Sequence, residues 1–139
     1  MPEGVIELEL CAPERDPIAL EVNEAIIPGA GGVFTVQHEH TPLLSKLLPG
    51  VVVAYCTDGQ ELHFAVDGGF AEVIDDRVVV LTDTMEPGDE IDTERAEEAK
   101  QRAEQRLGKS EEDVDITRAE AALSRALARI QAHGQVGYN

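Results

Sequence analysis

The chain has 139 residues, of which 28 are acidic and 11 are basic, so its formal net charge at neutral pH is −17. This length allows one compact core, or one core with a small appendage, and the negative field disfavours binding of most of the chain to nucleic acid or to anionic lipid. The longest unbroken apolar run is VVVAYC at 51–56, far short of the roughly 20 residues that cross a bilayer, so any membrane association is expected to come through a partner.

Short strand-like segments fill the first 82 residues. In VIELEL (5–10), Ile6, Leu8 and Leu10 alternate with two glutamates, which is the period of a half-buried strand. Further candidates lie at 20–27, 32–36, 51–56, 61–66, 70–74 and 77–82. Gly, Pro and Asp turns separate them, and no segment between them is long enough for a crossover helix, which predicts an antiparallel sandwich or barrel. We expect TPLLSKLL (41–48) to be a short helical or irregular insert.

Charge and periodicity both change near Glu90. Residues 1–91 contain 18 acidic and 3 basic side chains, whereas residues 92–139 contain 10 and 8. We therefore predict an α+β chain with two domains: an N-terminal antiparallel β-sandwich at 1–87, followed by a C-terminal antiparallel α-helical hairpin at 88–139.

The cysteines and histidines offer little chemistry by themselves. Cys11 and Cys56 lie in no metal-binding spacing, and two thiols without a signal peptide are typical of a reducing cytoplasm. His38 and His40 flank a glutamate, and His63 is the nearest candidate for a third ligand. A solvent-facing loop is the interpretation we favour there, and a small metalloenzyme, which would carry stoichiometric metal, is the alternative.

The last 48 residues contain an internal repeat. IDTERAEEAKQRAEQRL (91–107) and VDITRAEAALSRALARI (114–130) are identical at eight of seventeen positions. Both are rich in Ala, Glu and Arg, and each has an N-cap type of residue near its start, Asp92 or Asp115. Gly108 is expected to end the first helix, and the short connection makes the two helices antiparallel.

Each predicted helix has an apolar stripe made largely of alanine. The stripes are Ala96, Ala99, Ala103 and Leu107 on the first helix, and Ile116, Ala119, Leu123, Ala126 and Ile130 on the second. Alanine lets helices approach closely but removes little apolar area from water, so the docking free energy should be about a few kcal/mol. Weak docking suits an element that moves.

The arginines of the repeat allow two interpretations. In the first, they are exposed and pair with glutamates one turn away, as Glu98 and Arg102 would. In the second, Arg125 and Arg129 bind an anion, either the carboxylates of a partner or a phosphate, because no acidic residue follows Glu120 on their helix.

Taken in order, several stretches resemble the epsilon subunit of bacterial F-type ATP synthase. They are PGAGG (28–32), the His-x-Pro-Leu-Leu stretch from His40 to Gly50, GGFAEV and VVVLTD within 68–83, and the paired D-x-x-R-A-E of the repeat. The resemblance extends from about Ile6 to Ile130. It departs from the family pattern in the loop at 32–42, where Thr35 and His38 replace an expected Gly and Pro.

The resemblance implies a non-catalytic subunit of the rotor stalk, without a required cofactor or metal. Its sandwich would bind the gamma subunit and the c-ring, with His38, His40, Pro42 and Leu43 as candidate partner-binding residues. Its hairpin would switch between a folded state and an extended state that enters the alpha/beta head and blocks ATP hydrolysis. The expected location is the cytoplasmic face of the bacterial plasma membrane, attached only through the complex.

Some members of that family bind ATP as a regulatory ligand in the folded state. Carried over by position, the residues implied are Glu86, Ile91, Asp92, Arg95, Ala96, Arg125 and Arg129. From a different class, the chain could be a free-standing acidic adaptor whose hairpin captures a basic protein. Strong binding to proteins other than gamma would favour that alternative.

Overall fold

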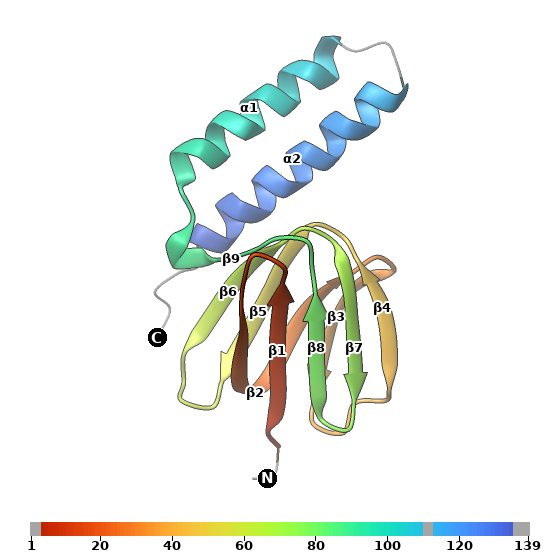
Figure 1. Ribbon diagram of the computed structural model, residues 1–139, viewed down its shortest axis with the longest axis vertical. Helices are drawn as coiled ribbons and strands as arrows, with labels where there is room; N and C mark the ends of the chain where they lie inside the picture. The colour runs from red at the N-terminus through yellow and green to blue at the C-terminus, as the bar shows by residue number, and fades with distance from the viewer. Residues whose placement is uncertain (1–3, 110–112, 135–139) are drawn as a thin grey trace.

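The computed structural model describes residues 4–109 and 113–134, and it shows a β-sandwich with a helical hairpin against one end (Figure 1). The strands are β1 (Ile6–Ala12), β2 (Arg15–Gly29), β3 (Gly32–Gln37), β4 (Leu43–Leu47), β5 (Gly50–Cys56), β6 (Glu61–Val66), β7 (Gly69–Ile74), β8 (Arg77–Leu81) and β9 (Met85–Pro87). The helical elements are the 3-10 turn η1 (Gly88–Glu90), α1 (Thr93–Lys109) and α2 (Asp113–Gly134). This is the predicted α+β class, with the sandwich first and the hairpin second.

One folded-over sheet forms the sandwich. Its strand order is β1-β8-β7-β4-β2-β5-β6-β9, with β3 paired to β2. The pairs are antiparallel except for β1 with β8, which run parallel. The 15-residue β2 passes from one layer to the other: it pairs with β1 up to Val22 and with β5 from there on, with an irregularity between Val22 and Glu24.

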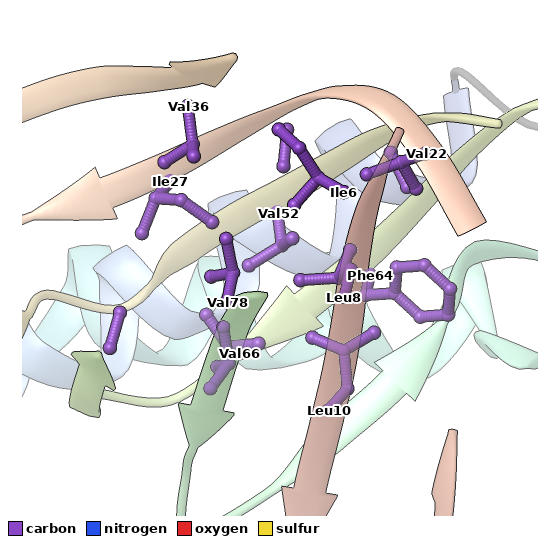
Figure 2. Packing of buried hydrophobic residues seen from close by; sticks show 14 of the residues in the cluster. Ile6, Leu8, Leu10, Val22, Ile27, Val36, Val52, Phe64, Val66 and Val78 are labelled. Atoms are coloured by element: carbon purple, nitrogen blue, oxygen red, sulfur yellow. The ribbon is translucent and has the colours of Figure 1, made fainter. Parts of the chain in front are cut away.

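The core lies between the two layers, and the alternation in the sequence places it there. Along β1, Ile6, Leu8 and Leu10 are buried, while Glu7 points outward. Figure 2 shows side chains of β1 converging with Phe64 and Val66 of β6 and with residues of β2, β5 and β8. Branched aliphatic side chains predominate in this cluster, which is typical of a well-packed β core.

The segment at 41–48 is a strand, so our expectation of a helical or irregular insert was wrong. Residues Leu43–Leu47 form β4, which pairs antiparallel with β7, and Leu44 lies opposite Glu72. The leucine spacing misled because it fits one helical turn as well as a short strand. The open edge of β7 decided the conformation, because it offers backbone hydrogen bonds that a helix there would leave unused. The three-residue β9 was not predicted either.

Gly69 has no room for a side chain. Its φ is +102°, in the region that favours glycine, and a Cβ atom there would collide with the carbonyl oxygen of Leu81 on β8. The close approach of β7 and β8 therefore requires glycine at position 69.

The hairpin is closed by small side chains. Figure 1 shows α1 and α2 antiparallel, and the two helices pack against each other. Ala96, Ala103, Ala119 and Ala126 are each at most 2% exposed. Two details of the prediction were wrong: α1 continues through Gly108 to Lys109, and α2 begins at Asp113, two residues before the expected cap Asp115.

In the part of the chain that the structure describes, α2 lies on the sandwich, where it contacts β5, β6, β9 and η1. Ala132, near its end, is fully buried in a small apolar cluster with Ile91 and Ala65, and Val51 packs against this cluster. Neither α1 nor α2 combines the length and the apolar character that a helix needs to cross a bilayer.

Candidate functional site

An arginine of α2 is held by a carboxylate of the sandwich. Arg129 Nε lies 2.7 Å from Glu86 Oε1, and Arg129 Nη2 donates a hydrogen bond of 3.2 Å to Glu86 Oε2. The contact at Nε is electrostatic, because its geometry does not meet that of a hydrogen bond, so the hydrogen bond of this pair is the one that Nη2 donates. About a quarter of the Arg129 side chain and a third of the Glu86 side chain are exposed, so water screens this pair only in part.

One turn earlier, Arg125 faces a second carboxylate. Its Nε lies 3.9 Å from Asp67 Oδ2, and 45% of the arginine side chain is exposed. This separation exceeds a hydrogen bond, and solvent weakens the attraction. Arg125 and Arg129 therefore both face carboxylates of the sandwich, and not acidic neighbours on their own helix.

Asp67 is positioned by the turn between β6 and β7. Its backbone N–H lies 3.1 Å from Thr82 Oγ1 and 3.2 Å from the carbonyl oxygen of Thr84, and the Thr82 hydroxyl also donates to that carbonyl. Asp67 and Thr84 were not predicted, because Asp67 lies in a turn-like Asp-Gly-Gly stretch and Thr84 lies in no motif that we singled out. The available signal was the excess of acidic residues in the sandwich over the basic residues that could pair with them.

A cavity of about 40 Å³ lies between these groups. Its lining consists of Ala65, Val66, Asp67, Thr84, Glu86, Arg125 and Arg129. At about 10–15 Å³ for each water, such a volume holds a few water molecules and no nucleotide. A phosphate that bound both guanidinium groups here would compete with the two carboxylates for them.

Only some of the residues that the family resemblance implies for ATP binding lie at this cavity. Ile91 is buried beside it, under Ala132 and Ala65. Asp92 instead caps α1, because its Oδ1 accepts a hydrogen bond of 3.1 Å from the backbone N–H of Arg95. The side chain of Arg95 is exposed and Ala96 is buried between the helices, so neither lines the cavity.

The end of α2 is attached to the segment that joins sandwich and hairpin. His133 Nδ1 lies 3.1 Å from the carbonyl oxygen of Gly88 in η1 and can donate a hydrogen bond to it. Together with Ala132, Arg125 and Arg129, this contact holds one face of α2 against the sandwich. These contacts define what we call the α2 docking face.

The other sequence candidates lie in and beside the loop between β3 and β4. His38 Nδ1 is 2.9 Å from Asp76 Oδ2, while His40 Nδ1 contacts the carbonyl oxygen of Thr41 at 2.6 Å. Pro42 and Leu43 are exposed. Among the described residues, no three His, Cys, Asp or Glu side chains come together as metal ligands, so His63 does not join the pair at 38 and 40.

Large apolar side chains are exposed on the outer side of β4, β7 and β8, where they alternate with Lys46, Glu72 and Arg77. Leu44, Phe70, Ile74 and Leu81 are between 45% and 69% exposed, and the pairing of Phe70 with Leu81 places two of them directly opposite each other. We call these four residues the outer apolar face. A groove lined by Phe70, Leu81 and Lys46 adjoins it.

Comparison with known proteins gives matches over both halves of the chain. Residues 5–88 match the family described as ATP synthase, Delta/Epsilon chain, beta-sandwich domain, and residues 89–134 match the corresponding long alpha-helix domain. A relative named ATP synthase epsilon chain from Moorella thermoacetica is 43% identical over 131 residues, which are 94% of this chain and 98% of the relative.

Two solved structures share the fold at low sequence identity. A chain in the Euglena gracilis mitochondrial ATP synthase (OSCP/F1/c-ring) matches with a TM-score of 0.77 and 24% identity, covering 93% of this chain and 81% of that chain. A chain in the Tetrahymena thermophila mitochondrial ATP synthase (central stalk/c-ring) matches with a TM-score of 0.66 and 14% identity, covering 92% of this chain and 96% of that chain.

Proposed function

Because this chain belongs to the ATP synthase delta/epsilon family, as a non-catalytic epsilon subunit, we propose that it couples and regulates the central stalk of a bacterial ATP synthase. In this proposal its sandwich binds the gamma subunit and the c-ring, and its hairpin regulates ATP hydrolysis in the alpha/beta head. Association with the membrane is peripheral, at the cytoplasmic face, and comes through the complex.

The outer apolar face is the observation that carries this proposal. Large exposed apolar side chains on three adjacent strands are unusual on an isolated protein and typical of an interface with another protein. Phe70 supplies an aromatic side chain on β7, the central strand of the three, and aromatic residues are enriched in protein interfaces. Burying this face against the gamma subunit is compatible with a docked α2, whose main contacts with the sandwich are to other strands, β5, β6 and β9.

The test is co-purification of the full chain with its gamma subunit. Changing Phe70 and Leu81 together to Asp should abolish capture, because two desolvated charges would replace two apolar anchors. Val33→Asp is the matched control, since Val33 is 72% exposed but lies outside the outer apolar face. Undiminished capture by the double variant would reject this face as the gamma-binding surface.

Regulation by ATP is the second part of the proposal, and Arg125 and Arg129 are its proposed phosphate-binding residues. Glu86 and Asp67 hold them in the docked state, so ATP would exchange carboxylate partners for phosphate partners. A ligand at a hundredfold excess over its dissociation constant stabilises the state that it binds by about 2.7 kcal/mol. That is similar to the estimated docking free energy of the hairpin, so ATP could determine its position.

Titration of the isolated chain with ATP tests this part separately. ATP should raise the thermal midpoint of the wild type and should leave that of Arg129→Ala unchanged, with Arg102→Ala on exposed α1 as the control for loss of charge. Equal responses of the wild type and both variants, or no response at all, would contradict ATP sensing without affecting the role in the stalk.

A further inference from the structure

A cavity lies between β2 and β6, beside the segment 87–90 that leads into the hairpin. It has a volume of about 300 Å³ and an apolar floor. Ile18 and Leu20 form the β2 side of this floor, and Leu62 and Phe64 form the β6 side. This volume is at the lower end of the range for small-ligand pockets. We call the cavity the β2–β6 seam.

Strand edges without partners border the seam on both sides. β9 pairs with β6 only from Phe64 to Val66, so in the described chain no strand covers this edge of β6 at residues 61–63. On the other side, residues 15–20 of β2 pair with β1 alone, since the pairing of β2 with β5 begins only at Val22. Unpaired strand edges of this kind are templates for an additional strand.

The rim of the seam is acidic. Glu61, Asp89 and Glu90 line it, and no Lys or Arg is among the lining residues. Arg15, at the start of β2, is already engaged, because its guanidinium lies 3.4 Å from both carboxylate oxygens of Glu90. His63 Nε2 lies 2.9 Å from Glu61 Oε2. The chemistry of the rim therefore repels anions and fits a cationic ligand.

We propose that the β2–β6 seam binds an extended segment of a partner protein in which basic and apolar side chains alternate. The segment adds as a strand to the β6 edge at 61–63 and continues the line of β9. Its apolar side chains enter between Leu20 and Leu62, and its basic side chains lie near the acidic rim. This mode of recognition uses the strand edge, the apolar floor and the charge together.

A ligand in the β2–β6 seam would also contact the segment 87–90, which connects the sandwich to the hairpin. Pro87, Gly88, Asp89 and Glu90 form one wall, and the carbonyl oxygen of Gly88 is the group that His133 contacts. A strand seated against this wall holds η1 in place and thereby favours the docked state of α2. This consequence requires only that the hairpin opens, and it depends on neither gamma binding nor ATP.

The test uses the full chain labelled with ¹⁵N and a blocked hexapeptide probe of alternating lysine and valine. Binding should shift the amide resonances of residues 61–63 and 88–90, slow hydrogen exchange at 61–63, and slow the opening of α2. A hexapeptide of alternating glutamate and valine should not bind. Because the whole protein is acidic, a second comparison must distinguish binding at the seam from nonspecific electrostatic attraction of the basic peptide.

Two charge reversals provide that comparison. Glu61→Lys places a positive charge on the rim, whereas Glu72→Lys makes the same change at an exposed position on the opposite layer, in β7. Affinity for the basic probe should fall roughly tenfold in Glu61→Lys and stay within about twofold in Glu72→Lys. The same circular dichroism spectrum for both variants establishes that they are folded.

Three results would overturn the proposal. They are no binding of the basic probe, equal loss of affinity in the two variants, and shifts at 61–63 without slower exchange there. The last result, together with displacement of the probe by phenethylammonium, would identify the seam as a site for small amines instead of a strand-addition site. None of these outcomes bears on co-purification with the gamma subunit.

Discussion

The sandwich and the hairpin are held together by different kinds of contact. The sandwich buries large side chains such as Leu8, Leu10 and Ile27 almost completely, whereas the hairpin is closed by alanines and attached by two arginine–carboxylate pairs. A buried leucine contributes about 1.5–3 kcal/mol through removal from water, far more than an alanine methyl group. We therefore expect that opening or detachment of the hairpin would leave the core of the sandwich intact.

The largest expected effect is the loss of a core side chain from the sandwich. Leu8→Ala should lower the free energy of unfolding by about 2–5 kcal/mol, because it removes buried methyl groups and leaves a cavity. Urea denaturation followed by circular dichroism measures this change. Ile74→Ala, at a residue 45% exposed, is the control and should change stability by about 0.5 kcal/mol or less. Similar values for both variants would mean that the core between the layers is not the main source of stability.

A substitution between the two helices should lower the stability of the hairpin and leave that of the sandwich unchanged. Ala126→Leu adds carbon atoms at a buried position of the hairpin and should cost about 1–3 kcal/mol of hairpin stability. Hydrogen exchange resolved by residue should show faster exchange in α1 and α2 and unchanged exchange in β1 and β8. Leu127→Ala, on an exposed side of α2, should leave both regions unchanged. Faster exchange in the sandwich would contradict the independence of the two regions.

The two arginine pairs should contribute unequally to docking. Arg129→Ala leaves the partly buried Glu86 without its partner and should destabilise the docked state by about 1–2 kcal/mol. Arg125→Ala removes a longer and more exposed contact and should cost about 0.5 kcal/mol or less. The opening rate of α2, measured by hydrogen exchange, reports both effects. The reverse order would show that Asp67, and not Glu86, is the main anchor.

The smallest effect concerns an ion pair on the surface of the sandwich. The hydrogen bond from Arg77, followed by that from Cys11, lowers the pKa of Glu9 below its ordinary value of 4.5. A carboxyl group whose pKa is lowered by folding stabilises the fold above its unfolded pKa, and this contribution is lost as pH falls through the folded pKa. The stability difference between the wild type and Glu9→Gln should thus be present at pH 7 and decline as the pH falls below 4.5. Urea midpoints across this range measure it, and a constant difference would show that Glu9 acts by another route.

Much of the fold followed from local patterns. All seven strands expected from alternation are present, and the eight identities of the repeat correspond to two paired helices with their alanines buried. The prediction for the segment at 41–48 was wrong because its conformation depends on pairing with β7, which lies more than twenty residues away in the chain. Of the candidate site, the sequence identified Glu86, Arg125 and Arg129 but missed Asp67, and it gave no indication of the outer apolar face.

The sequence by itself determined where the spacing of apolar residues changes from that of strands to that of helices. It also determined which residue caps α1 and which helix faces carry side chains small enough for close packing. These properties depend on neighbours within a turn or a strand, so they can be inferred from spacing. Only the tertiary structure decided that Arg129 meets Glu86, 43 residues earlier, and that an edge of β6 remains uncovered beside η1. Such contacts depend on how the two regions pack against each other, and spacing along the chain carries no information about that packing.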